Sequence, residues 1–323
     1  MPARVIVVGA RRRRQGIGPY VARALARAGA DVCAVVGSTN DTSLEAAVDL
    51  KKFDVLRASA YADLGDALRS ERADLVAVCA PNDTHRTFLL TAAQHGAGCL
   101  CDKPLWWDTD SMRAGDVESQ TASIVDAFVD RGLLLDTLTQ WAEAWPIYDA
   151  LYPHATGEPV RSFRMILSPI EFGPSMVPDA LPHALSLLWA RVGAGVVDRA
   201  TAVFDEPQRR LRVGFDYQHQ HGSTSAQCVF TACESQPRPA AFGVNGRMAH
   251  RAIEMSDYSM RLVADNGRGA SLPDPLDSFI RNFLRRLERR PTTDRPRLLS
   301  SMTNLWRVYD AALQAFGAQA TQR

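Results

Sequence analysis

The sequence predicts two domains: an α/β domain with a doubly wound parallel sheet, then an α+β domain with a mainly antiparallel open sheet and helices. Three observations support this fold class. Residues 1–139 alternate short apolar runs with helical patterns, which is typical of a parallel sheet covered on both faces. A glycine-containing turn separates the first apolar run from the first helical pattern. In residues 140–323, most strand-like runs follow one another without helices between them, which favours antiparallel pairing.

The first domain begins with the apolar run Arg4–Val8, which ends at Gly9 as a buried parallel strand does. Ile17–Ala28 then places Val21 and Leu25 on one helical stripe. Right-handed crossovers between such units make the sheet doubly wound. The predicted strands are 4–8, 31–36, 75–79, 98–101 and 133–138, and the predicted helices are 17–28, 42–50, 64–70, 85–95 and 117–131.

The second domain has a different order of elements. A helix at 141–151, a strand at 160–167 and a helix at 178–192 come first. Five strand-like runs follow, separated by Gly, Pro and charged turns, and two helices close the chain. These predicted strands are 200–204, 211–217, 226–231, 239–244 and 258–263, and the closing helices are 279–289 and 298–316.

Composition limits the classes of function. The chain has 323 residues, 46% hydrophobic and 23% charged, which is ordinary for a soluble globular protein. A net charge of +1 argues against nucleic acid as a partner, and no apolar stretch approaches the roughly 20 residues of a membrane helix. The start of the chain lacks a signal-peptide layout and the six cysteines are scattered, so we expect a cytoplasmic protein with reduced thiols.

No metal site is expected. Cys99 and Cys101 share one face of a strand, and so do His219 and His221. Each pair lacks the further ligands that a tetrahedral site needs.

The turn after the first strand resembles a dinucleotide-binding turn. Gly9 can form the tight bend, and Gly16, Ile17 and Gly18 lead into a helix whose N-terminus can face a pyrophosphate. Several arginines are inserted, so the strict glycine spacing is absent. Arg11 and Arg12 can pair with cofactor phosphate, whereas a solvated loop is the alternative for the arginine run.

The end of the second strand bears on the choice of cofactor. NAD-selective sites usually place Asp or Glu there to bind the ribose 2′-hydroxyl. Here the strand is followed by Ser38 and Thr39, and the first carboxylate is Asp41. Small hydroxyl side chains leave room for a 2′-phosphate, so NADP is favoured, with NAD as the alternative.

Lys103 follows the apolar run Gly98–Cys101 and precedes Pro104. Lysine is rarely buried unless it is paired or active. Because ligands bind at the carboxyl ends of parallel strands, a cation at this position can bind a substrate hydroxyl or carbonyl. A solvated loop lysine is the alternative that this segment alone leaves open.

Three segments together resemble the Gfo/Idh/MocA family of NAD(P)-dependent oxidoreductases, which includes glucose–fructose oxidoreductase and inositol dehydrogenase. They are the amino-terminal strand–turn–helix, the pair Ala80–His85 and Cys101–Leu105, and Asp179–His183. The family signature Glu-Lys-Pro is matched at its last two residues, with Asp102 in place of the glutamate. The resemblance covers essentially the whole chain and implies a Rossmann domain followed by a substrate-binding and oligomerisation domain.

The resemblance also implies roles for three residues. Hydride transfer between nicotinamide and a secondary alcohol moves a hydroxyl proton, which a histidine can accept or donate near neutral pH. His183 would transfer this proton, with Lys103 as its electrostatic partner or as the acid itself, and Asp179 would orient the substrate. The structural alternatives are a helix-start role for Asp179 and a buried packing role for His183.

The cofactor would lie over the strand ends of the first domain. The side chains and turns expected to bind it are Gly9, Arg11, Arg12, Gly16, Ile17, Gly18, Ser38, Thr39, Pro81, Asn82, His85, Asp102 and Lys103. The other partner is a small-molecule substrate, a sugar, polyol or sugar-derived metabolite. The family commonly forms homodimers or homotetramers, and the open sheet suits such an assembly.

Two alternative functions remain. The apolar, proline-containing segment Pro174–Pro178 before Asp179 suggests reduction of an imine or enone in a specialised pathway. A regulator that binds NAD(P) without catalysis is the other, although the joint presence of Lys103, Asp179 and His183 speaks against it.

Overall fold

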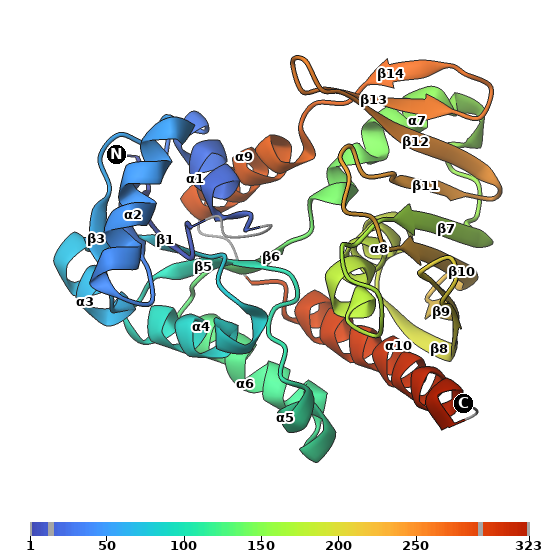
Figure 1. The fold of residues 1–323 in the computed structure, drawn as a ribbon, viewed down its shortest axis with the longest axis horizontal. Helices are drawn as coiled ribbons and strands as arrows, with labels where there is room; N and C mark the ends of the chain where they lie inside the picture. The colour runs from blue at the N-terminus through green and yellow to red at the C-terminus, as the bar shows by residue number, and fades with distance from the viewer. Residues whose placement is uncertain (1, 12–15, 290–292, 322–323) are drawn as a thin grey trace. The chain divides into compact units, whose positions relative to one another are not determined.

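The computed structural model describes residues 2–11, 16–289 and 293–321. The chain divides into two compact units (Figure 1). Unit 1 comprises Met1–Leu138 and Leu276–Leu299, and unit 2 comprises Thr139–Pro275 and Ser300–Arg323.

Unit 1 is built on a parallel six-stranded sheet with the order β3-β2-β1-β4-β5-β6. The strands are β1 (Arg4–Val8), β2 (Asp31–Val36), β3 (Ser59–Tyr61), β4 (Leu75–Val78), β5 (Gly98–Asp102) and β6 (Leu135–Leu138). The strand order reverses between β1 and β4, which is the switch point where ligands bind in such sheets. The predicted doubly wound parallel sheet is therefore confirmed.

Helices connect these strands. They are α1 (Gly18–Arg27), α2 (Asn40–Leu50), α3 (Leu64–Glu71), α4 (His85–Gln94), α5 (Thr109–Ala114) and α6 (Val117–Val129), with short 3₁₀ turns η1 (Lys51–Phe53) and η2 (Asn82–Thr84). Thr39 caps α2 in a reciprocal capping box with Thr42, so this helix begins two residues before the predicted range 42–50. The sequence also did not predict β3 and α5, which are too short for a clear period.

A segment near the carboxyl end returns to unit 1. Helix α9 (Pro275–Glu288) is amphipathic and buries Ile280, Phe283 and Leu284 in the core of the parallel sheet. The sequence assigns all of residues 140–323 to the second domain. An apolar stripe on a helix indicates that the helix is buried, but it does not indicate which sheet the helix packs against.

The returning segment is also bound through a buried ion cluster. Asp136 on β6 accepts hydrogen bonds from Arg286 and Arg297, and its carboxylate is almost fully buried. Thr293 accepts a hydrogen bond from the backbone N–H of Leu135 and donates one to the carbonyl of Leu133. These contacts close the β6 edge of the sheet.

Unit 2 contains an eight-stranded sheet with the order β14-β13-β12-β11-β7-β10-β9-β8. All neighbours are antiparallel except β7 and β10. The mainly antiparallel sheet is therefore confirmed. The strands are β7 (Ser162–Leu167), β8 (Gly195–Asp205), β9 (Arg210–His219), β10 (Gly222–Thr231), β11 (Ala241–Val244), β12 (Arg247–Glu254), β13 (Ser259–Ala264) and β14 (Gly269–Ser271). The sequence did not predict β12 and β14, because β12 carries charged residues at several positions and β14 is three residues long.

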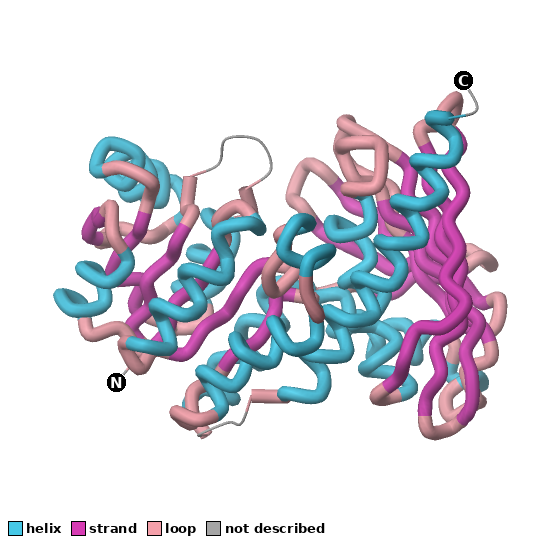
Figure 2. Tube along the Cα trace, turned by 90° about the horizontal axis from the view of Figure 1, so that it is seen from below, coloured by secondary structure: helices cyan, strands magenta, loops and turns pink. Residues whose placement is uncertain are grey.

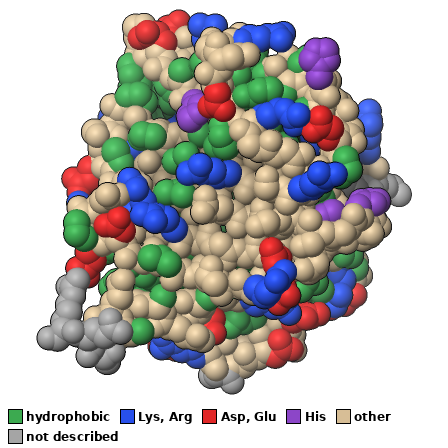
Figure 3. All heavy atoms as spheres, turned by 90° about the vertical axis from the view of Figure 1, so that its right-hand side faces the viewer, with side chains coloured by type: hydrophobic (Ala, Val, Ile, Leu, Met, Phe, Trp, Pro, Cys, Tyr) green, Lys and Arg blue, Asp and Glu red, His purple; other side chains and the backbone are tan. Residues whose placement is uncertain are grey.

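Helices cover one face of this sheet (Figure 2). They are η3 (Gln140–Ala144), α7 (Trp145–Leu151), η4 (Pro153–Ala155), α8 (Met176–Val192) and the carboxyl-terminal part of α10 (Arg295–Thr321). The other face is open: along β9, Leu211, Val213 and Phe215 are buried, whereas the residues between them are not. Figure 3 shows that charged side chains and histidines are scattered over this open side.

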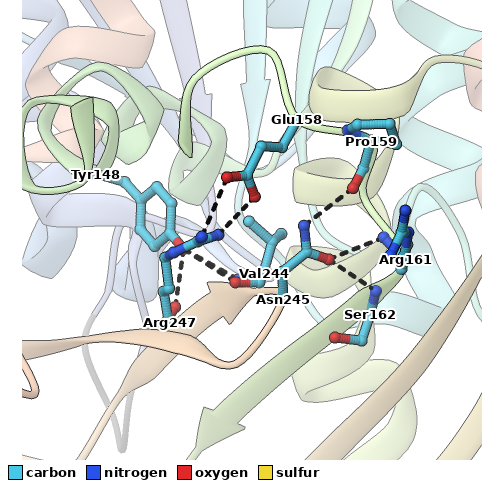
Figure 4. Close-up of polar contacts among 8 residues, drawn as sticks. All are labelled: Tyr148, Glu158, Pro159, Arg161, Ser162, Val244, Asn245 and Arg247. Carbon is cyan, nitrogen blue, oxygen red and sulfur yellow. Dashed lines mark hydrogen bonds and ion pairs between the residues drawn. The ribbon is translucent and has the colours of Figure 1, made fainter. Parts of the chain in front are cut away.

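A polar cluster fixes one end of the sheet (Figure 4). The Asn245 side chain accepts a hydrogen bond from the backbone N–H of Arg161 at 2.9 Å and donates one to the carbonyl of Pro159 at 2.9 Å. Beside it, Glu158 and Arg247 form an ion pair with two short N···O distances, 2.8 and 3.1 Å. The β11–β12 turn is thereby held against the start of β7, and we assign this cluster a structural role.

Candidate active site

The carboxyl ends of β1, β4 and β5 bring three predicted segments of unit 1 to one edge of the sheet (Figure 1). Gly9 follows β1, Pro81 follows β4, and Lys103 follows β5. Parallel neighbours end at the same edge, so this arrangement follows from the topology.

The two glycines of the β1–α1 turn are required by close backbone contacts. Gly9 has φ +78°, and a Cβ atom there would lie 2.6 Å from the carbonyl oxygen of Cys79. A Cβ on Gly18 would lie 2.4 Å from the carbonyl oxygen of Gly9. The turn therefore packs against the end of β4 through backbone atoms, which only glycine permits at these two positions.

The start of α1 suits an anion. Ile17 is the N-cap residue, no side chain caps the helix, and its first turn carries no acidic residue. Backbone N–H groups at such a helix end bind phosphate readily. Gly16 precedes this helix, and Arg12 lies outside the described residues.

The end of β2 has hydroxyl side chains where many sites have a carboxylate. Ser38 and Thr39 are exposed, and Asp41 lies in the first turn of α2. The guanidinium group of Arg11 reaches α2 and forms an ion pair with Glu45 at 2.6 Å. A cation is thereby held next to the helix that starts at this strand end.

His85 connects the loops that follow β4 and β5. Its side chain is fully buried; Nε2 lies 2.9 Å from the carbonyl oxygen of Ala80, and Nδ1 lies 3.0 Å from that of Pro104. Cys101 Sγ also approaches Nδ1, at 3.2 Å. The cofactor contact of His85 stays a prediction; in this structure its ring lies against two backbone carbonyls and thereby positions the two loops.

Lys103 is half-buried and follows directly on this scaffold. Its backbone N–H donates to the Asp102 carboxylate at 2.8 Å, and the Lys103–Pro104 peptide bond is cis. The backbone N–H of Trp107 donates to the carbonyl of Asn82 at 3.2 Å, so a second bond links the same two loops. The backbone that carries Lys103 is therefore fixed on both sides.

Asp179 and His183 lie in unit 2, on α8. They are one helical turn apart and therefore lie on the same side of the helix. Asp179 is exposed and His183 is buried, with 9% of its surface accessible. Pro182 inside the helix removes one backbone donor just before His183.

Within the described ranges, no group of three His, Cys, Asp or Glu side chains is arranged to hold a metal ion. All six cysteines are free thiols. Burial raises the pKa values of Cys99, Cys101 and Cys228, which keeps these thiols protonated near neutral pH. None of the described helices is long and apolar enough to cross a bilayer.

The doubly wound sheet with a glycine turn after its first strand has the arrangement of a dinucleotide-binding domain. Residues 3–117 match the family model described as "Oxidoreductase family, NAD-binding Rossmann fold". The Gfo/Idh/MocA resemblance inferred from the sequence is confirmed over these residues. A search among curated proteins finds no match.

Solved structures with the same fold include three dehydrogenases. UDP-N-acetylglucosamine 3-dehydrogenase GnnA from Acidithiobacillus ferrooxidans is 19% identical with a TM-score of 0.70, over 98% of this chain and 99% of that one. Levoglucosan dehydrogenase in complex with NADH and levoglucosan is 12% identical, with a TM-score of 0.69 and coverage of 99% and 98%. GenD2 from gentamicin A biosynthesis, in complex with NAD, is 16% identical, with a TM-score of 0.69 and coverage of 98% and 95%. The likeness extends over both units, so the fold of the whole chain is that of these enzymes.

Proposed function

We propose that the protein transfers hydride between a nicotinamide cofactor and a secondary alcohol, or its ketone, in a sugar, polyol or sugar-derived metabolite. The observation that carries this proposal is Lys103, a half-buried cation on a fixed loop at the same strand edge as the glycine turn. Similar structures of sugar dehydrogenases support the choice of substrate class.

A nicotinamide bound at this strand edge would accept the hydride released when the carbinol C–H bond breaks. The hydroxyl proton goes to the imidazole of His183, while the Lys103 ammonium group donates a hydrogen bond to the oxygen and stabilises developing negative charge. Asp179 accepts a hydrogen bond from a neighbouring substrate hydroxyl. In the reverse direction, His183 returns the proton to the carbonyl oxygen.

Two substitutions test these assignments. Lys103→Ala should lower kcat by about 10²–10⁴-fold, the usual contribution of such groups, with little change in cofactor Kd. Lys52→Ala is the matched control, because the Lys52 side chain is 73% exposed and forms an ion pair with Asp49, three residues earlier. His183→Ala should remove the pH dependence of hydride transfer near neutrality. Normal turnover in Lys103→Ala, or an unchanged pH profile in His183→Ala, would refute the corresponding role.

NADP is the proposed cofactor. The hydroxyl groups of Ser38 and Thr39 leave space at the end of β2, and Arg11 supplies a cation near it. Arg11→Ala should weaken NADP binding while leaving NAD binding nearly unchanged, because only NADP carries the 2′-phosphate. Equal effects on the two cofactors, or tighter binding of NAD by the native protein, would contradict this choice.

The proposed assembly is a homodimer or homotetramer formed through the open face of the eight-stranded sheet. That face carries exposed apolar residues on β8, including Val196 and Val203, next to charged ones. Light scattering should give at least twice the 35.4 kDa chain mass, and a charged substitution at Val203 should lower it. A monomeric native protein would contradict this assembly.

Free thiols with raised pKa values fit the reducing cytoplasm, which is the proposed location.

The alternative function, reduction of an imine or enone, was suggested by the apolar segment Pro174–Pro178, and the structure gives that segment another explanation. Met176 and Val177, which made the segment before Asp179 look like an apolar approach to substrate, are fully buried in the first turn of α8. Packing accounts for their apolar character.

A further inference from the structure

One end of the eight-stranded sheet is the end from which the chain enters α8. β7 ends at Leu167 and its parallel neighbour β10 ends at Thr231, so both strands finish at this end. β11 is antiparallel to β7 and therefore starts here, and β12 reaches the same end with its last residues. The topology thus brings Ser168, Arg238 and Arg251 together in unit 2.

These three residues are joined by hydrogen bonds. Arg251 Nη2 donates to the carbonyl oxygen of Arg238 at 2.9 Å, and Arg238 Nη1 donates to that of Ser168 at 3.3 Å. The Ser168 hydroxyl donates to the carbonyl oxygen of Pro239 at 3.1 Å. The two arginines are therefore attached to the loop that leads into the helix of Asp179 and His183.

Arg251 also lies on the helix-covered side of the sheet. Its Cζ atom lies 5.4 Å from the ring centroid of Trp141, which is on η3. Trp141 in turn packs edge-on against Phe242 at 6.0 Å. Trp141 is itself buried, with 6% of its surface accessible, so this contact fixes the position of the Arg251 guanidinium group.

The positive charges of Arg251 and Arg238 are not balanced by a carboxylate among the described residues. Burial lowers the pKa of Arg251 and the neighbouring Arg238 lowers it further, whereas Tyr258 and, more weakly, Asp274 act in the opposite direction. Within the part of the chain that the structure describes, neither arginine has a carboxylate at ion-pair distance, and Arg251 Nε is buried without a hydrogen-bond partner.

Other buried arginines of the chain differ in this respect. Arg297 is paired with Asp136, and Arg191 is paired with Asp149 at 2.9 Å. Arg251 has a hydrogen bond and a cation–π contact but, among the described residues, no carboxylate to balance its charge, and such a charge is costly in a largely buried place. Two guanidinium groups placed together without a counter-ion are typical of a site for an anion.

We propose that Arg251 and Arg238 bind an anionic group of the substrate, a carboxylate or a phosphate. This inference rests on the proposed function, which it narrows from sugars in general to acidic or phosphorylated sugars. The guanidinium groups would donate hydrogen bonds to the anionic oxygens, and the Trp141 ring beneath Arg251 would hold that side chain in place. The site would determine which substrate is accepted and would take no part in hydride transfer itself.

The test measures binding, so it does not depend on turnover. Calorimetric titrations of the full-length protein, saturated with NADP, use inorganic phosphate, D-glucuronate and neutral D-glucose as probes. We expect one of the two anions to bind to the native protein. Its Kd should be at least tenfold higher for Arg251→Gln and for Arg238→Gln. Arg261→Gln, on exposed β13 surface, is the matched control and should bind as the native protein does.

The relative affinities of the two anions identify the ligand group. Tighter binding of glucuronate identifies a carboxylate as the ligand, and tighter binding of phosphate identifies a phosphoryl group. Absence of binding by both anions, or equal binding by the native protein and both variants, overturns the proposal. NADP affinity and thermal unfolding verify that each variant is folded, and Arg251→Lys, which keeps the charge, replaces Arg251→Gln if the latter is unstable. A protein that binds the anion but catalyses no hydride transfer would refute the proposed function and leave this site intact.

Discussion

Replacement of His85 by leucine removes both links between the loops after β4 and β5 that run through its ring. Leucine has a similar volume and keeps the site filled, so the main loss is polar. The carbonyl oxygens of Ala80 and Pro104, 2.9 and 3.0 Å from the ring nitrogens, would be left without this partner in a fully buried place.

The magnitude follows from these two contacts. A buried polar group that loses its hydrogen-bond partner costs about 1–3 kcal/mol. Because a neutral imidazole carries a single N–H, it donates to only one of these carbonyls at a time, so the expected loss is about 1–3 kcal/mol in the free energy of unfolding of unit 1. Because the same loop carries Lys103, kcat should also fall, whereas in the Lys103→Ala background the His85 substitution should cause no further fall.

Urea unfolding measures this loss as a lower transition midpoint at constant slope. His95→Leu is the matched control, since His95 is exposed at the end of the same helix and should change stability by less than about 0.5 kcal/mol. A destabilisation of His85→Leu below about 1 kcal/mol would refute the reasoning. So would an equal fall of kcat in the native and Lys103→Ala backgrounds.

Three further predictions concern unit 1 and are checked by urea unfolding. Asp136→Asn leaves two arginines without their buried carboxylate and should lower the free energy of unfolding by about 3–5 kcal/mol. Asp49→Asn, in an exposed pair, should lower it by less than about 1 kcal/mol. Similar losses in the two variants would contradict the role of burial. Gly9→Ala should destabilise more than Gly29→Ala, because both have positive φ but only Gly9 lies against a backbone oxygen; equal losses would exclude that contact. Hydrogen bonding to an arginine lowers the pKa of Asp126 below 3.8, so this pair stabilises the fold above the unfolded-state pKa and loses its effect as pH falls through the folded value; Asp126→Asn should flatten the pH dependence between pH 6 and 3.

Parts of the candidate site could be predicted because their signals are local. The apolar run Arg4–Val8 and the glycine after it indicate a buried strand and a tight turn. The position of Lys103 directly after another such strand places it at the sheet edge, since all strands of a parallel sheet end on one side. The spacing of Asp179 and His183 likewise places both on one side of a helix.

Other features depend on residues that are far apart in the sequence. The charged strand β12 shows no clear alternation, so nothing in its own residues indicates that Arg251 meets Trp141 and Arg238. The sequence marked His85 as a cofactor contact, because its position resembles a family motif, whereas its two ring contacts are with backbone atoms that only the folded loops bring near.

The sequence by itself determined the fold class, the order of most elements and the sheet edge at which Gly9 and Lys103 lie, because hydrophobic periodicity and strand direction are encoded locally. The tertiary structure decided that α9 returns to the parallel sheet, that Asp136 pairs with arginines about 150 residues later, and that two other arginines lack a carboxylate partner among the described residues. Pairing over such distances depends on packing and charge balance in the folded chain, which a local pattern does not record.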